Sequence, residues 1–129
     1  MRFLIVVMLL SSSLAAQEPT HTSTVVNGSV INGYGDIKAK YPAINRSVYI
    51  FEGIYKEILI DQIPIKVVKT DKQGKFTVRL SPTIYTFAIL VGGRYVAGNV
   101  RRDGYYPFVD CSPLKETSIE LVDNSKNLN

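Results

Sequence analysis

Short runs of β-type residues, separated by Gly, Pro, Asn and Asp, make up most of the chain after residue 24. Apolar and polar residues alternate strictly over 75–80, so one side of this strand faces a core and the other faces water. The run 84–90 is apolar enough on both faces for a central strand. No segment repeats at the helical period over three turns. The pattern therefore predicts an all-β chain, and the spacing of the runs favours a small β-sandwich.

The expected strands are 25–32, 47–52, 65–69, 75–80, 84–90, a short strand around Tyr95, and 117–122. Segment 65–80 is expected to form a hairpin. Its turn would use Asp71 as an acceptor for backbone N–H groups and Gly74 for the positive φ that closes it. Segment 54–60 fits either a strand extension or a two-turn helix.

The first sixteen residues have the pattern of a secretory signal peptide. Arg2 supplies the positive charge, residues 3–10 form an unbroken apolar run, and Ala15 and Ala16 are small residues that suit signal peptidase. We expect cleavage after Ala15 or Ala16 and a periplasmic or secreted product. The apolar run is much shorter than the about 20 residues of a membrane span, so no span is expected in the mature chain.

The expected organisation is a signal peptide at 1–16, a flexible leader at 17–23, one β-sandwich domain at 24–123 and a polar tail at 124–129. Removal of the first 16 of 129 residues leaves 113, a length that suits a single domain. The formal net charge of +4 falls to +3 with the loss of Arg2. This charge is too small to indicate a nucleic-acid partner.

The composition leaves little catalytic chemistry. The chain has one cysteine, one histidine and no tryptophan, which excludes a disulfide framework and a zinc site built from several Cys and His side chains. The histidine, His21, lies in the polar leader without packed neighbours to set its pKa. We therefore expect no enzyme, no metal and no cofactor.

Cys111 follows the apolar run 106–109, and a lone cysteine in such a run is usually a small buried hydrophobe. If it were exposed in an oxidising compartment, it would join two chains through an intermolecular disulfide. The expected state is a monomer or a weak homodimer.

One cluster combines guanidinium groups with aromatic rings between glycines: Arg94, Tyr95, Arg101, Arg102, Asp103, Tyr105 and Tyr106. Such side chains suit contacts with carbohydrate or carboxylate groups, and they are common at the centres of protein interfaces. The alternative is a solvated loop whose tyrosines pack back on the sandwich.

Four sequence elements together resemble the carboxypeptidase regulatory-like domain. They are Val26-Asn27-Gly28-Ser29-Val30, Pro42-Ala43 before the strand at 48–50, Thr70-Asp71-x-x-Gly74-x-Phe76, and Leu80-Ser81-Pro82-x-x-Tyr85. The resemblance covers residues 25–90. It implies a prealbumin-like, seven-stranded Greek-key β-sandwich.

The family resemblance also implies a noncatalytic module, here exported and with a structural or binding role in the cell envelope through protein or carbohydrate contact. The alternative function is a transthyretin-like small-ligand carrier or hydrolase. The related hydroxyisourate hydrolases use strand histidines and end in Tyr-Arg-Gly-Ser, whereas this chain ends in Lys126-Asn127-Leu128-Asn129. A carrier would need a dimer channel or an apolar pocket, and a hydrolase would need convergent polar groups.

Two modifications are compatible with the sequence. A Lys–Asn isopeptide crosslink, as in the similar pilin-type sandwich domains, would join Lys38 or Lys40 to Asn124 beside a buried acid. Asn27 and Asn45 begin glycosylation patterns, which matter if the source is eukaryotic.

Overall fold

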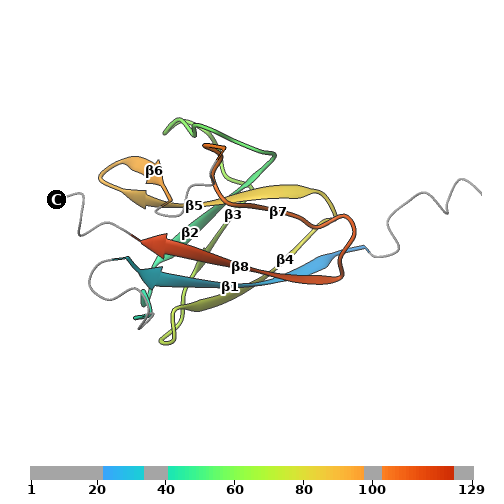
Figure 1. Ribbon diagram of the computed structural model, residues 1–129, viewed down its shortest axis with the longest axis horizontal. Coiled ribbons are helices and arrows are strands. Elements are labelled where there is room, and N and C mark those ends of the chain that lie inside the picture. The colour runs from blue at the N-terminus through green and yellow to red at the C-terminus, as the bar shows by residue number, and fades with distance from the viewer. Residues whose placement is uncertain (1–21, 34–40, 98–102, 124–129) are drawn as a thin grey trace, which may run out of the picture.

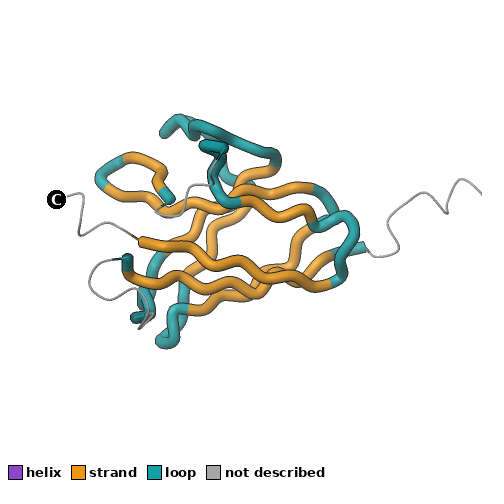
Figure 2. Tube along the Cα trace, in the orientation of Figure 1, coloured by secondary structure: helices purple, strands orange, loops and turns teal. Residues whose placement is uncertain are grey.

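The computed structural model describes residues 22–33, 41–97 and 103–123, and in these ranges it contains eight strands and no helix (Figures 1 and 2). The strands are β1 (Thr24–Asn32), β2 (Ser47–Glu52), β3 (Lys66–Lys69), β4 (Lys75–Leu80), β5 (Ile84–Val91), β6 (Arg94–Val96), β7 (Phe108–Asp110) and β8 (Glu116–Asp123). The all-β class is confirmed. The structure has one strand more than expected: β7, a three-residue strand that the sequence pattern did not indicate.

The predicted signal peptide 1–16, most of the leader 17–23 and the tail 124–129 lie outside the described residues. Within the described ranges, no helix is long and apolar enough to cross a membrane.

The strands form two sheets. The first has the order β4-β1-β8, with β1 antiparallel to β4 and parallel to β8 (Figure 1). The second has the order β3-β2-β5-β6, and β7 also pairs with β5, next to its first residues. The central strands are therefore β1 in one sheet and β2 and β5 in the other.

The two sheets share one hydrophobic core, which gives a sandwich-like arrangement of two layers. Its buried members come from both sheets and from two connecting segments: Val26, Val30, Ala43, Val48, Ile50, Phe76, Val78, Leu80, Tyr85, Phe87, Ile89, Cys111 and Leu121. The rings of Phe76 in β4 and Phe87 in β5 meet across the layers with centroids 6.1 Å apart. The inward alternation predicted for 75–80 is confirmed, since buried and exposed residues alternate along β4.

The turn at 70–74 forms as predicted, but the hairpin does not. Gln73 and Lys75 donate their N–H groups to the Asp71 carboxylate at 2.8 and 3.0 Å, and Gly74 has a φ of 72°. These backbone hydrogen bonds hold the pKa of Asp71 below its usual value. However, β3 pairs with β2 and β4 pairs with β1, so the turn carries the chain from one sheet to the other.

A buried hydroxyl holds the chain in the second sheet up to this turn. Thr70 Oγ1 donates to the carbonyl of Ala43 at 2.6 Å and accepts the N–H of Arg46 at 2.8 Å. The N–H of Thr70 donates to the carbonyl of Arg46 at 2.9 Å. Thr70 is thus tied to the segment before β2, and this non-local tie favours the pairing of β3 with β2.

Gly74 makes a close contact between the turn and the first sheet. Its carbonyl accepts the N–H of Val30 at 2.8 Å, and the carbonyl of Val30 accepts the N–H of Ala43 at 2.9 Å. A Cβ at position 74 would lie 2.8 Å from Pro42 Cβ and 2.8 Å from the Val30 oxygen. Only glycine combines this φ with this proximity.

Gly28 makes room for an aromatic ring in the core. It stands directly opposite Phe76 in the β1–β4 register. A Cβ at position 28 would lie 2.0 Å from the Cζ atom of Phe76, so the ring occupies the space of the missing side chain. The glycine of the first sequence element and the phenylalanine of the third therefore form one packing unit.

Segment 54–60 is neither a strand nor a helix, so both predicted alternatives are wrong. It belongs to an irregular connection between β2 and β3, in which Ile58 is buried and Ile54 is exposed. The connection lies over the outer side of the second sheet (Figures 1 and 2). The shared spacing of Ile54 and Ile58 was misleading because only one of the two packs inward.

We predict that Gly28→Ala lowers the free energy of unfolding by about 1–3 kcal/mol, because the new methyl group must displace the Phe76 ring. Urea unfolding followed by circular dichroism measures the change. Phe76→Leu combined with Gly28→Ala should recover part of the loss, since the shorter side chain frees the space. Ser29→Ala, on the other face of β1, is the control and should change little. An unchanged midpoint for Gly28→Ala would contradict the close packing.

Candidate functional site

A second, smaller hydrophobic cluster lies on the outer face of the five-stranded sheet. Its buried members are Phe51 from β2, Ala88 from β5, Tyr95 from β6 and Ile58 from the β2–β3 connection. The Tyr95 ring meets Phe51 edge-on at 5.0 Å and Tyr49 at 5.4 Å between centroids. Both faces of this sheet are therefore apolar, and the connection covers part of the outer one.

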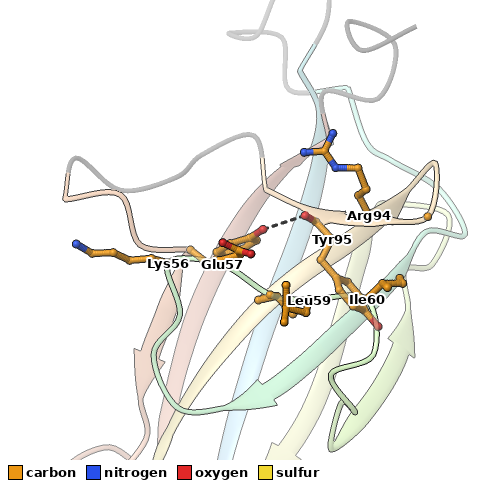
Figure 3. Close-up of a pocket in the computed structure, with 9 residues that line it drawn as sticks. Lys56, Glu57, Leu59, Ile60, Arg94 and Tyr95 are labelled. Atoms are coloured by element: carbon orange, nitrogen blue, oxygen red, sulfur yellow. Dashed lines mark hydrogen bonds between the residues drawn. The ribbon is translucent and has the colours of Figure 1, made fainter.

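Hydrogen bonds fix the β2–β3 connection and the segment before β7 to each other. Tyr106 donates its N–H to the carbonyl of Tyr55 at 2.9 Å. Its hydroxyl donates to the carbonyl of Tyr95 at 2.9 Å, as the dashed line in Figure 3 shows. The Tyr55 hydroxyl donates to the carbonyl of Glu52 at 2.7 Å. Tyr55 and Tyr106 thus tie the two irregular segments to each other and to the backbones of β2 and β6.

These segments enclose an open pocket of about 530 Å³. Its lining residues are Lys56, Glu57, Ile58, Leu59, Ile60, Gly93, Arg94, Tyr95 and Tyr106. In Figure 3, Lys56 and Arg94 lie on opposite sides of the pocket, with Leu59 between them and Ile60 on the side of Arg94. The pocket combines charges of both signs with apolar side chains.

The structure brings part of the predicted cluster together. Arg94, Tyr95 and Tyr106 line the pocket side by side, although Tyr95 is 9% exposed and serves mainly in packing. Tyr105 lies outside the lining: its ring packs edge-on against Phe108 at 6.5 Å, and the Lys56 ammonium lies 4.9 Å from its centroid. The tyrosines of the cluster therefore largely pack back on the sheet, as the alternative interpretation predicted.

Of the remaining members of the predicted cluster, the structure describes Asp103 alone. Arg101 and Arg102 lie outside the described residues. Asp103 accepts the N–H of Tyr105 at 3.2 Å, which makes it part of a local turn.

Burial raises the pKa of Tyr95 and of Tyr106 above the usual value for tyrosine. Both hydroxyls therefore stay protonated at neutral pH, and that of Tyr106 is already engaged with a backbone carbonyl. They can orient a bound group as neutral hydrogen-bonding partners. They are poorly suited to proton abstraction.

Sequence reasoning missed the pocket residues of the β2–β3 connection. The available signal was the apolar run 58–60, in a segment whose pattern fitted both a strand and a helix. In the structure, Leu59 and Ile60 are each 59% exposed. Their exposure follows from the path of the connection, which periodicity does not reveal.

The exposed aliphatic residues continue from the pocket to the edge of the sheet. We call Leu59, Ile60, Ile63, Ile65 and Val67 the apolar strip; the most exposed of them is Ile63, at 81%. Val67 faces Tyr49 in the β2–β3 register, and Tyr49 touches Tyr95. Val67 therefore lies on the same side of the sheet as the pocket, which Leu59 and Ile60 themselves line.

Cys111 lies in the main core with no exposed surface. Its N–H donates to the carbonyl of Thr83, and its carbonyl accepts the Thr24 hydroxyl at 2.8 Å. Burial raises the pKa of its thiol. A disulfide with a second chain would require this part of the core to open.

A buried acid stands at the end of β8. Asp123 has no exposed surface, and its Oδ2 atom lies 2.7 Å from Nε of Arg46. The sequence pattern gave no sign of this pair. Lys38, Lys40 and Asn124, the residues of the hypothetical isopeptide crosslink, lie outside the described residues.

The two glycosylation patterns differ in their surroundings. Asn27 is in the central strand of the first sheet, where its amide donates to Glu116 at 2.7 Å and its oxygen accepts the Thr77 hydroxyl at 3.2 Å. Asn45 lies in an exposed turn with a φ of 54°. His21 is not described, and the described residues contain no group of three His, Cys, Asp or Glu side chains that could hold a metal ion.

No protein-family model matches the chain, and no curated protein matches it. Among solved structures, the Bacillus anthracis TIE protein is similar over 81% of this chain and 17% of its own, with a TM-score of 0.51 and 12% identity. A DUF3823 family protein from Parabacteroides merdae matches 78% of this chain and 45% of its own, with a TM-score of 0.45 and 16% identity.

A third similar structure is a 9R-lipoxygenase from Cyanothece, which matches 90% of this chain and 20% of its own, with a TM-score of 0.42 and 9% identity. The chain thus spans less than half the length of each of these proteins. The likeness to the TIE protein concerns the fold alone, and it supports a β-rich domain.

We predict that the free energy of unfolding falls as the pH rises above about 9. Burial raises the folded-state pKa of Cys111 above 9.0 and that of Tyr85, Tyr95 and Tyr106 above 10.0. The unfolded chain therefore loses these protons at a lower pH than the folded chain, and stability is retained below that range. Urea midpoints at pH 7, 8, 9 and 10 measure the slope.

Tyr106→Phe should make this alkaline slope shallower, because it removes one of the buried hydroxyls. The control is Tyr41→Phe, at a position that is 56% exposed, which should leave the slope as in the parent chain. Stability that stays constant from pH 7 to 10 would contradict the burial of these groups.

Proposed function

We propose that this chain is an exported, noncatalytic binding module of the carboxypeptidase regulatory-like type, which contacts a protein partner through the outer face of its five-stranded sheet. The observation that carries the proposal is the apolar strip next to the pocket. Ile63 is 81% exposed and Leu59 is 59% exposed on a connection that hydrogen bonds otherwise hold in place. Exposed apolar surface bordered by charged groups is typical of protein interaction sites.

The packing supports the family assignment. Gly28 of the first sequence element accommodates the Phe76 ring of the third, and Gly74 of the third lies against Pro42 of the second. The residues that carry the resemblance are therefore neighbours in space. These residues make contacts between chain segments, which fits a motif that specifies architecture rather than chemistry.

The exposed side chains favour a protein over a carbohydrate as the partner. Sugar rings stack on open aromatic faces, whereas Tyr95 is buried and meets its neighbours edge-on. The exposed groups around the pocket are aliphatic, and Lys56 and Arg94 line it as well. Aliphatic side chains with peripheral charges suit a polypeptide surface.

The pocket supports a binding role better than the carrier or hydrolase alternative. A carrier must enclose most of its ligand in an apolar cavity, and this pocket is open and carries Lys56, Glu57 and Arg94. The Tyr106 hydroxyl is neutral and already bonded to the Tyr95 carbonyl, so it does not converge on a substrate position.

We predict that a photo-crosslinking amino acid at position 59 forms a defined adduct with one partner protein in the native host. The same amino acid at Ser118, exposed on the other sheet, is the matched control and should form none. Ile60→Asp in the first variant should reduce the adduct about tenfold, because it places a charge at the centre of the apolar contact. Equal adducts from positions 59 and 118 would refute the proposed surface.

We also predict that the chain is exported and loses its first 15 or 16 residues. N-terminal sequencing of the exported protein should then begin at Ala16 or Gln17. A variant without residues 2–16 should remain in the cytoplasm with its β-sheet circular dichroism unchanged. An exported chain that still carries residues 1–16 would contradict the cleavage.

A further inference from the structure

We infer that the free edge of β3 accepts an extended, acidic segment of the partner polypeptide as an additional strand of the five-stranded sheet. The inference rests on the proposed function, since it specifies the chemistry of the protein partner and the way in which that partner is bound.

The backbone of β3 is available for such pairing. β3 is the first strand in the order β3-β2-β5-β6, and among the described residues it pairs with β2 alone. The N–H of Thr70 bonds to the carbonyl of Arg46, and hydrogen-bonded pairs alternate along an antiparallel ladder. The N–H and carbonyl groups of Val67 and Lys69 therefore point away from β2, toward an incoming strand.

The side chains of this edge are exposed and apolar on the outer face. Val67 is 47% exposed and lies opposite Tyr49 in the β2–β3 register, on the side of the sheet that carries the pocket. Ile65, just before β3, is 49% exposed and donates its N–H to the carbonyl of Ile50 at 2.8 Å. An added strand would cover Val67 and continue the sheet beside the apolar strip.

The charges of β3 indicate that the segment pairing with its edge is acidic. Lys66 and Lys69 are both exposed and flank Val67 and Val68 in a four-residue strand. A partner strand with an acidic residue at each end and apolar residues between them would place opposite charges across from both lysines. Opposite charges on paired strands are stabilising, and like charges are destabilising.

A second copy of this chain fits the edge poorly. Antiparallel pairing of two β3 strands must place outward-pointing residues opposite each other, so Val67 of one copy would face Val67 or Lys69 of the other. In neither register does an acidic side chain stand opposite Lys66 or Lys69. Parallel pairing would place each lysine opposite its own equivalent. Lysines also protect sheet edges from aggregation, but that role does not require the exposed Ile65 and Val67 beside them.

The test uses two synthetic peptides and the purified chain, with NMR backbone amide shifts as the readout. The acidic peptide is Thr-Glu-Val-Val-Glu-Thr, and its matched control, Thr-Lys-Val-Val-Lys-Thr, differs only in charge. The acidic peptide should shift the amides of 65–69 and bind about tenfold more tightly than the control. Combined Lys66→Glu and Lys69→Glu should reverse this preference. Equal binding of the two peptides, or shifts confined to the other sheet, would overturn the inference.

Val67→Pro tests the backbone contribution. Proline removes an N–H that points away from β2, so the β2–β3 ladder and the fold should persist while the acidic peptide no longer binds. Val67→Thr retains the N–H and is the control, which should still bind. Undiminished binding to Val67→Pro, or self-association of the parent chain that Val67→Pro abolishes, would overturn the inference.

The two proposals can fail separately. If position 59 forms its specific adduct but neither peptide shifts the amide signals of residues 65–69, the proposed binding module is supported and strand addition at β3 is refuted. If the acidic peptide binds as expected but no adduct forms, the edge of β3 is a binding site, and the proposed partner-binding surface around position 59 is refuted.

Discussion

The rest of the fold depends on two backbone hydrogen bonds of Val30, which join β1 to the turn before β4 and to the segment before β2. The N–H of Val30 donates to Gly74 and its carbonyl accepts from Ala43, so one residue of β1 fixes both the turn before β4 and the segment before β2. The two hydrogen bonds are short, at 2.8 and 2.9 Å, and no side chain at position 74 stands between the segments. The relative position of the two sheets follows from this contact, because the chain passes between them at the same turn.

The five-stranded sheet is apolar on both sides, and the two sides are used differently. One side completes the main core with residues such as Phe87, and the other carries the cluster around Phe51 and Tyr95. The irregular β2–β3 connection covers only part of this outer cluster. Aliphatic side chains of the connection itself remain in contact with water, and the candidate site is the boundary between the covered and the open area of the sheet.

Local patterns predicted the elements whose burial alternates, such as β4, and the turn chemistry of Asp71 and Gly74. Pairing was harder to predict, because β3 pairs with β2 and not with the adjacent β4, and contacts that favour this pairing, such as that of the Thr70 hydroxyl with Ala43, join residues far apart in sequence. In the candidate site, Arg94, Tyr95 and Tyr106 could be named from residue types alone. Residues 56–60 could not, since their pattern fitted both a strand and a helix, whereas the segment is an irregular connection whose burial is decided by the sheet beneath it.

The parallel pairing of β1 and β8 has a mechanical consequence. The first strand begins at Thr24 and the last ends at Asp123, at opposite ends of the same ladder of eight paired residues (Figure 1). A force that pulls these two ends apart acts parallel to the strands. The β1–β8 hydrogen bonds must then break together, whereas a force perpendicular to the strands would break them one after another. Tension along the chain would therefore be borne by the three-stranded sheet, while the outer face of the five-stranded sheet stays out of the load path.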